Sequence, residues 1–441
     1  MTCTPVSSSL LNNTQLEMMI MNSKTPTILV TDAGRGSAIA IIRSLGRKGW
    51  RIIAADTDPK SIGFRSRYVH DTMLYPNPET NGCAVVEALY EGAKQKQVDL
   101  IIPVTDAIIL PLAKSRARFE GLCQLALPED SALAVVTDKC KTLHLAEQVG
   151  VPTPQTILVH TVQEAGAAAA RLNWPIVLKP LASRLHDQAG GTRGFKVSYA
   201  TDLAQLLARM QTYAAHQCPV LLQEYYAGVG QGVELLMDHG QPLAVFQHKR
   251  HSEVPVQGGA SALRESMSPT PELYEYSVRL LQQIQWTGLA MVEFKVGHDG
   301  PKLMEINGRV WGSLPLAVHS GVDFPARLAE LYLSPAALPV TPSVATPGST
   351  PPADYEVGVR SRNLDLEITW IFAVLYGQRR YPFLPMPSRR QGMTAFINLF
   401  NPRTKFDILS WKDARPGWGE LRKIVGKQYQ KLQNLGKDST D

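Results

Sequence analysis

Two glutamates and an asparagine in one short stretch have the residue types and spacing to bind a metal ion. Residues 289–309 form two runs of alternating apolar and polar residues around a glycine-containing turn at 297–301, a pattern typical of a β-hairpin. Such a hairpin would place Glu293 opposite Glu305, with Asn307 on the same face. Opposed carboxylates repel each other across a sheet, and a divalent cation between them would remove this cost. Two carboxylates and an amide oxygen suit Mg²⁺ that also holds substrate phosphates.

The same hairpin also fits a simpler interpretation, in which both glutamates lie on a solvated outer face. The other face would then be the core side, formed by Val292, Phe294 and Val296 against Met304 and Ile306. The hairpin alone does not separate these two interpretations, so the rest of the chain has to decide.

A lysine and a glycine-rich loop could bind phosphates. Lys179 ends an apolar strand that begins at Pro175, where its ammonium could reach a nucleotide while its stem lies on apolar surface. A lysine that protects an edge strand is the alternative. The loop that follows could direct several backbone N–H groups at a phosphate, and a plain hairpin turn is the alternative there. Its residues of interest are Gly190, Gly191, Arg193 and Gly194.

Two further segments could contact an organic ligand. The strand that ends in Gln223-Glu224-Tyr225-Tyr226 suits an adenine ring held by backbone groups against an aromatic wall. The glycine-rich segment Val254–Met267 is expected to be a loop. Arginine suits bidentate binding of a carboxylate substrate, although surface positions would explain the same residues. The candidates in and near this loop are Arg250, Gly259, Ser261 and Arg264.

Length and composition limit the class of protein. A chain of 441 residues should form two or three domains, and 44% hydrophobic with 19% charged residues is normal for a globular protein. The net charge of +6 is spread without a basic run, so nucleic-acid binding is not expected. Five scattered cysteines argue against a disulfide framework or a zinc site. No apolar run reaches the ~18 residues of a membrane span, and residues 1–23 lack Lys and Arg, so we expect a cytoplasmic protein without membrane contact.

The first part of the chain reads as a flexible lead-in (1–25) and a Rossmann-like domain (26–136). A strand at Thr27–Thr31, a glycine turn and a helix at about Ser37–Lys48 lead to a second strand that ends at Asp56. The glycine pattern lacks a third glycine or alanine, because isoleucine stands at position 39. We therefore expect no nicotinamide site, while a nicotinamide-dependent oxidoreductase remains an alternative to be tested.

The rest of the chain reads as one large domain and an extension. Residues 137–334 form the large domain, in which short strands and helices alternate over about 150–226. Residues 335–354 are rich in Pro, Ser and Thr and read as a linker. Residues 355–441 look folded and mostly helical, with an unknown role.

The order of these candidates is similar to a known superfamily. Lys139, Lys179, the glycine loop, the segment 223–226 and Glu305-x-Asn307-x-Arg309 follow one another as in the ATP-grasp superfamily, over roughly residues 27–330. The segment MEINGRVWGSLPLAVHSGVDFP looks like carbamoyl-phosphate-synthase-like, stand-alone ligases that join a carboxylate to an amine. The resemblance implies an α/β chain with a Rossmann-like domain before two α+β subdomains that clamp ATP, followed by the helical extension.

The resemblance also implies a role for each candidate. Lys139 and Lys179 would contact the ATP phosphates, the loop 190–194 with Arg193 would fold over them, and Arg309 would steady the transferred phosphoryl group. The cofactors would be ATP and two Mg²⁺ ions, with Mn²⁺ as a substitute. The metal ligands would be Glu293, Glu305 and Asn307. Adenine would lie against Gln223, Glu224, Tyr225 and Tyr226, while Gln231, beside Glu234, stands where the family often has a ribose-binding glutamate.

Four functions follow from these observations. The first is a ligase that joins a small-molecule carboxylate to an amine through an acyl-phosphate, with a homodimer among the assemblies considered. The second is carboxylation through carboxyphosphate, as in biotin carboxylase. The third is the nicotinamide-dependent oxidoreductase, and the fourth is a nucleotide-binding regulator without turnover. No nucleophilic Cys or Ser motif is present, which agrees with acyl-phosphate chemistry.

Overall fold

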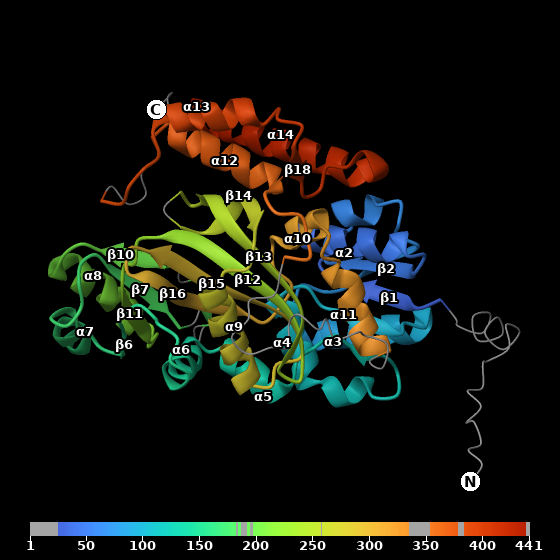
Figure 1. Cartoon of the computed structure of the whole chain (residues 1–441), viewed down its shortest axis with the longest axis horizontal. Coiled ribbons are helices and arrows are strands. Elements are labelled where there is room, and N and C mark those ends of the chain that lie inside the picture. The colour runs from blue at the N-terminus through green and yellow to red at the C-terminus, as the bar shows by residue number, and fades with distance from the viewer. Residues whose placement is uncertain are drawn as a thin grey trace, which may run out of the picture.

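The computed structural model describes residues 25–181, 184–186, 192–194, 197–256, 258–334, 353–377 and 383–437. Side chains are described except those of 184–186, 192–194 and 428–437. The expected lead-in and nearly all of the expected linker lie outside these residues. Figure 1 shows a parallel sheet with its helices, a central twisted sheet, a small sheet at the far end and a separate layer of C-terminal helices.

The N-terminal part is a parallel sheet of five strands in the order β3-β2-β1-β4-β5. Its central strands are continuous apolar runs, as expected when helices cover both faces. Gly49 follows the first helix with φ 81°, as a helix-ending glycine should. The strands are β1 (Thr27–Val30), β2 (Arg51–Asp56), β3 (Asp71–Leu74), β4 (Leu100–Ile102) and β5 (Gln124–Leu125). The helices are α2 (Gly36–Arg47), η1 (Ile62–Arg65), α3 (Gly82–Lys96), α4 (Asp106–Lys114), η2 (Arg116–Phe119) and α5 (Asp130–Val136).

A small antiparallel sheet follows, in the order β10-β7-β11-β6, with a hydrophobic core of its own beneath two helices. Thr161 accepts a hydrogen bond from the Glu164 N–H at 3.1 Å, which begins the second of the three helices of this part. The strands are β6 (Thr156–Val159), β7 (Ile176–Pro180), β10 (Ser198–Ala200) and β11 (Val220–Glu224), and β8 (Arg184–His186) pairs with β9 (Thr192–Gly194). The helices are α6 (Lys139–Gln148), α7 (Val162–Ala169) and α8 (Leu203–Ala214).

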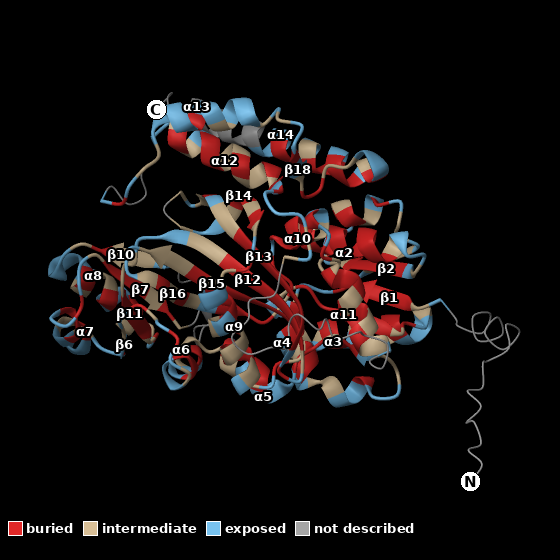
Figure 2. Ribbon diagram, in the orientation of Figure 1, coloured by how far each residue is buried: buried red, intermediate tan, exposed pale blue. Residues whose placement is uncertain are grey.

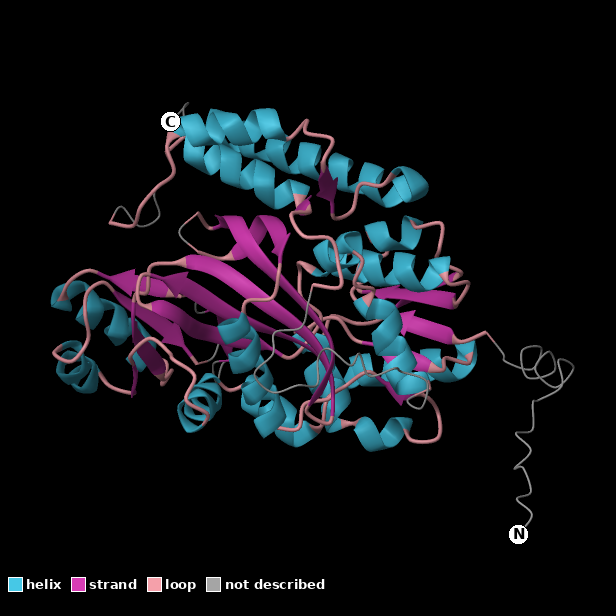
Figure 3. Ribbon diagram, in the orientation of Figure 1, coloured by secondary structure: helices cyan, strands magenta, loops and turns pink. Residues whose placement is uncertain are grey.

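The central sheet has seven strands in the order β16-β15-β12-β13-β14-β17-β18, and the last two come from the C-terminal part. Its buried residues belong to the same clusters as those of the N-terminal helices. Figure 2 shows buried residues along this sheet, and Figure 3 shows its strands. The strands are β12 (Val229–Asp238), β13 (Gln241–Val254), β14 (Ala260–Met267), β15 (Gly288–Gly297), β16 (Gly300–Asn307), β17 (Arg360–Arg362) and β18 (Thr404–Phe406). The helices are α9 (Pro271–Gln283), α10 (Leu314–Ser320) and α11 (Phe324–Leu333).

Two expectations from the sequence were wrong. The segment expected as a loop contains β14, whose alternate residues are buried although one of them is Arg264. The register of β15 and β16 shifts by one residue after Glu293, so that Phe294 lies opposite Leu303. This β-bulge puts Leu303 in the core and leaves Met304 facing the cavity described below.

The described C-terminal residues, 353–377 and 383–437, are here called the C-terminal layer. Three helices in this layer are α12 (Leu364–Leu375), α13 (Arg389–Asn398) and α14 (Ala414–Lys437), with a short η5 (Trp411–Asp413) before the last. Buried ion pairs attach the layer to the rest of the chain. Arg264 bonds both oxygens of Asp407 at 2.5 Å, and Arg43 bonds Asp413 at 2.9 Å.

Candidate active site

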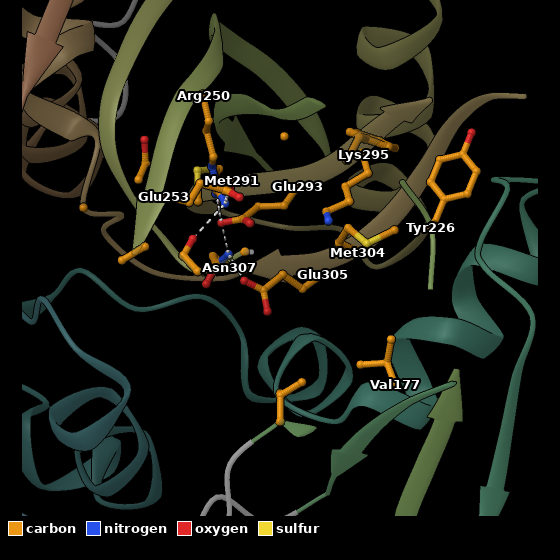
Figure 4. Close-up of a pocket in the computed structure, with 18 of the residues that line it drawn as sticks. Val177, Tyr226, Arg250, Glu253, Met291, Glu293, Lys295, Met304, Glu305 and Asn307 are labelled. Carbon is orange, nitrogen blue, oxygen red and sulfur yellow. Dashed lines mark hydrogen bonds and ion pairs between the residues drawn. The ribbon is translucent and has the colours of Figure 1, made fainter. Parts of the chain in front are cut away.

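The hairpin of β15 and β16 brings the two glutamates together as the sequence suggested. Glu293 lies opposite Glu305 in the register, and the Asn307 amide donates to one oxygen of each, at 3.1 and 3.0 Å (Figure 4). The Asn307 carbonyl in turn accepts from Arg309 at 2.8 Å. The solvated-face interpretation does not fit Glu293, whose side chain is 14% exposed, whereas Glu305 is exposed to the cleft. Burial and nearby Glu305 raise the pKa of Glu293 to about 7 against the effect of Arg250.

Two adjoining cavities, of about 450 and 400 Å³, meet at this hairpin. The larger one lies between the hairpin, the small sheet and β13–β14, and the smaller one extends toward α4 and α6. Together the two cavities form a cleft, which is lined by residues of the small sheet, the central sheet, α4 and α6. Residues shared by the two cavities include Lys179, Gln223, Met304, Glu305, Asn307 and Arg309.

Two expected phosphate-binding lysines lie on the side of the cleft facing the hairpin. Lys139 is the first residue of α6, and its ammonium donates to the Pro180 carbonyl at 3.1 Å. Lys179 lies on β7, where burial lowers the pKa of its ammonium to about 8 despite nearby Glu305. Among the described residues, no carboxylate forms an ion pair with Lys179. A half-buried ammonium that pairs with no described carboxylate favours an anionic ligand.

Arg309 is fixed at the entrance to the smaller cavity. Its Nε donates to Asp106 at 2.9 Å, so the N-terminal sheet contributes directly to the cleft through the start of α4. Gly308 allows this approach, since a Cβ there would overlap the Trp286 ring. The side chain therefore reaches the cleft from a backbone packed against the core.

Arg250 lies at the Glu293 end of the carboxylate pair, away from Arg309. Its guanidinium bonds Glu293 at 2.6 Å and Glu253 at 3.1 Å (Figure 4). Gly259 and Ser261 also line this end, and the buried Ser261 Oγ has no hydrogen-bond partner among the described residues. Arg264 differs from the expectation, because its guanidinium is 1% exposed and bonded to Asp407. The proposal below therefore leaves Arg264 out of the substrate contacts.

The expected adenine-binding segment lines the cleft at the end of β11. The Glu224 N–H donates to Gln155 and the Tyr225 N–H to Pro175, so neither of these two N–H groups is free to bind adenine. No backbone bond from the Tyr226 N–H occurs among the described residues, while its hydroxyl donates to Gly300 at 2.6 Å. An apolar wall is nearby, formed by Pro154, Val177, Val197, Tyr199, Tyr225, Phe294 and Met304.

Two groups of expected contacts are not placed in the cleft. Gln231 accepts from Gln247 at 2.9 Å and does not line either cavity, whereas its neighbour Gly230 does. Alternation along β12 explains this, since successive side chains point to opposite faces. Gly190 and Gly191 lie outside the described residues. Arg193 and Gly194 belong to β9, whose side chains are not described, so the phosphate-binding loop stays a prediction.

Several lining residues were missed from the sequence. Lys295 faces the cleft two residues after Glu293, and its ammonium lies 5.3 Å from the Tyr225 ring centroid. Strand alternation could have identified it. Glu253 also lines the larger cavity, but no pattern in the sequence indicated this position. Asn363 and Leu366 come from the C-terminal layer and also line the larger cavity. Their place depends on β17 pairing with β14, which no local pattern indicated.

Comparison with known proteins agrees with this geometry. The family model described as "ATP-grasp in the biosynthetic pathway with Ter operon" matches residues 216–346. The chain is 24% identical over 294 residues to the carbamoyl phosphate synthase large chain of Rubrobacter xylanophilus and 23% identical over 289 residues to that of Thermomicrobium roseum. These matches cover 65% and 63% of this chain but 26% of each relative, so the chain spans about a quarter of their length.

The chain thus has a match to an ATP-grasp family model and has relatives and structural neighbours of the ATP-grasp type.

Solved structures show the same fold. An ADP complex of purK, N5-carboxyaminoimidazole ribonucleotide synthetase, superposes with a TM-score of 0.60 at 14% identity, covering 85% of this chain and 96% of that one. An L-amino acid ligase from Bacillus licheniformis gives 0.53 at 16% identity, covering 71% and 75%. The biotin carboxylase of Campylobacter jejuni gives 0.55 at 16% identity, covering 76% and 74%. The predicted Rossmann-like domain followed by an ATP-grasp fold is thus confirmed.

Proposed function

We propose that this ATP-grasp protein is an ATP- and Mg²⁺-dependent ligase that activates a small-molecule carboxylate as an acyl-phosphate and joins it to an amine. The observation that carries the proposal is the opposed pair Glu293 and Glu305, bridged by Asn307 in a cleft that also contains several cationic side chains. Such a cleft combines ligands for divalent cations with groups that neutralise phosphates.

The residues present fit magnesium. Glu293 and Glu305 offer hard oxygen donors, and the Asn307 amide, whose NH2 group faces both carboxylates while its oxygen accepts from Arg309, would add a third after turning over. Burial, together with nearby Glu305, raises the pKa of Glu293, and a bound cation would offset this cost. Among the described residues no group of three or more His, Cys, Asp or Glu could hold a metal. When bound, Mg²⁺ would neutralise charge on the transferred phosphoryl group, and Mn²⁺ prefers similar donors.

The chain's own residues would bind and orient the nucleotide. Lys139 and Lys179 would face the phosphates, where the Lys179 ammonium, which pairs with no carboxylate among the described residues, would gain a partner. Arg309, held by Asp106, would keep its remaining N–H groups directed at the transferred phosphoryl group. Adenine would lie on the apolar wall that includes Val177 and Met304.

The carboxylate substrate would bind at the Arg250 end. The Ser261 hydroxyl offers a buried group without a partner among the described residues, and Arg250 offers a guanidinium beside the metal ligands. A carboxylate oxygen would attack the γ-phosphorus while its bond to the β–γ bridging oxygen breaks and ADP leaves. The amine nitrogen would then attack the acyl carbon, phosphate would leave, and the nitrogen would release a proton. Asn363 and Leu366 would border the space for these two substrates.

Mass spectrometry of products, after incubation with ATP, Mg²⁺ and pooled amino acids and carboxylates, tests the proposal. We expect an amide product formed in a one-to-one ratio with ADP and phosphate. The Glu305→Gln variant should lower turnover by about 10²–10³-fold because charge stabilisation at the phosphoryl group is lost. Labelled bicarbonate in the product would instead support the carboxylation alternative, and tight ATP binding without any product would contradict both.

A further inference from the structure

Exposed apolar side chains are concentrated on the C-terminal layer. Ten of the eighteen large apolar side chains that the described residues expose lie between Phe372 and Val425. Trp411 is 99% exposed and Trp418 is 60% exposed. Monomeric soluble proteins rarely collect such side chains on one part of their surface without a binding partner.

Helix α13 has an apolar face on each side. Gly392 and Ala395 pack toward α12, where the Val374 and Leu375 side chains approach Gly392. The outer face has a second apolar stripe at helical spacing, whose side chains are 46–78% exposed. Figure 2 shows much of α13 in the pale blue of exposed residues. The stripe consists of Met393, Phe396, Ile397 and Phe400. Folding of the described residues does not account for this second stripe.

The charges on the same layer are segregated by sign. From residue 383 to residue 427, the three acidic side chains Asp407, Asp413 and Glu420 are buried, with exposed fractions of 3%, 3% and 6%. All nine basic side chains in this range are exposed. They are Arg389, Arg390, Arg403, Lys405, Lys412, Arg415, Arg422, Lys423 and Lys427. Between residues 383 and 427 the surface charge is thus positive, with Lys427 paired to Asp365, whereas the exposed acids of the layer, Asp354 and Glu356, lie in its first segment.

We propose that the outer face of the C-terminal layer docks on an anionic lipid surface. Aromatic and aliphatic side chains would enter the headgroup region while Lys and Arg contact lipid phosphates, as for amphipathic helices that lie on membranes. This contact lies on the surface, since no helix among the described residues is long and apolar enough to cross a bilayer. The proposal replaces the expectation of no membrane contact and does not depend on the reaction in the cleft.

Two other occupants fit the surface less well. A symmetric dimer through this face would bring the basic residues of one copy against those of the other, which costs free energy. A nucleic acid would satisfy the basic residues but would leave the aliphatic side chains Met393, Ile397 and Val425 without a matching surface.

Flotation of the full chain with vesicles tests this proposal. We compare phosphatidylcholine vesicles with vesicles containing one quarter phosphatidylglycerol, at 0.1 M and about 0.5 M NaCl. The protein should float with the anionic vesicles only, and high salt should release most of it because screening shortens electrostatic range. The double variant Arg389→Gln/Arg390→Gln should bind about fivefold more weakly for each lost charge.

The apolar contribution is tested by Phe396→Ser/Ile397→Ser, for which we expect at least about tenfold weaker binding. Leu158→Ser/Leu203→Ser is the matched control, because these leucines are also partly exposed but lie on the small sheet and α8. All variants should keep wild-type MgATP turnover. Flotation with neither vesicle, equal flotation with both, or an unchanged apolar variant would each overturn the proposal. So would light scattering that shows a dimer which Phe396→Ser/Ile397→Ser dissociates.

Discussion

The cleft and the contact with the C-terminal layer both place arginines beside carboxylates inside the protein, but they balance charge differently. In the contact, Asp413 accepts from the Arg43 Nε at 2.9 Å, the Ser66 hydroxyl at 2.7 Å and the Arg67 N–H at 2.9 Å. In the cleft, two glutamates share a single amide, and Arg250 is divided between Glu293 and Glu253.

This difference separates structural pairs from a binding site. A buried carboxylate that has a full set of donors holds two parts of a chain together, and removing one partner is costly. In the cleft, burial and the neighbouring Glu305 carboxylate raise the pKa of Glu293, so this group gains from an added cation. The cleft and the contact with the C-terminal layer contain the same residue types, so only the hydrogen-bond partners of the carboxylates distinguish the two regions. The following predictions test the distinction from the largest expected effect to the smallest.

The Asp413→Ala variant should lower the free energy of unfolding by about 3–5 kcal/mol, because it leaves Arg43 buried without its carboxylate. Turnover of MgATP per folded molecule should not change. Urea unfolding followed by tryptophan fluorescence measures the first effect. Asp365→Ala is the matched control, since its partner Lys427 is exposed and the loss should stay below about 1 kcal/mol. Equal losses in the two variants would contradict a structural role for the buried pair.

The Glu293→Gln variant should act in the opposite direction on stability. Burial raises the folded-state pKa of Glu293 from 4.5 to about 7, so ionisation costs stability as pH rises through this range. At pH 8, without nucleotide or metal, the variant should be more stable than the parent by about 2 kcal/mol, less than the full shift because Arg250 loses one partner.

The stability gain of Glu293→Gln should disappear near pH 4.5, where the parent is also protonated, and Mg²⁺-dependent protection against unfolding should be lost. Thermal unfolding at pH 4.5, 6 and 8, with and without MgATP, gives both readouts. A variant that is less stable than the parent at pH 8 would show that the Glu293–Arg250 ion pair stabilises the protein without a metal ion.

The smallest effect concerns Lys179, the lysine proposed to bind the phosphates. Because burial lowers the pKa of Lys179 to about 8, kcat/KM for ATP should fall roughly tenfold per pH unit above that value as the ammonium becomes neutral. Lys179→Arg should remove this decline up to about pH 10, since arginine stays charged. The exposed Lys141→Arg should leave the profile as in the parent. A parent profile that is flat to pH 10 would mean that the charge of Lys179 is not required.

The sequence predicted the elements that local patterns specify. The hairpin register at Glu293 and Glu305, the parallel N-terminal sheet and helix α2 follow from alternation, apolar runs and helix ends. Alternation failed at Met304, because a β-bulge adds one residue that no local pattern marks. It failed again at β14, because an arginine at a core position made this strand look like a polar loop. In the structure, the buried Arg264 forms an ion pair with Asp407.

The parts of the cleft that the sequence did not predict depend on distant segments. Asp106 reaches Arg309 from the N-terminal sheet, and Asn363 enters from the C-terminal layer, far along the chain from the hairpin. Contacts of this kind arise from the topology of the sheets and leave no periodic signal. Gln231 illustrates the reverse case, since a suitable residue type stood near the expected position but on the wrong face of β12.

The seven-stranded sheet has one consequence for the evolution of the chain. Strand β17 covers the edge of β14, and β18 covers β17 in turn, so the last segment completes the hydrogen bonding of the nucleotide-binding module. A gene shortened before residue 360 would leave β14 with unpaired backbone groups, which invites aggregation. A transfer of the seven-stranded sheet to another protein would therefore have to include the C-terminal layer. The cleft and the outer surface of this layer would then be inherited together.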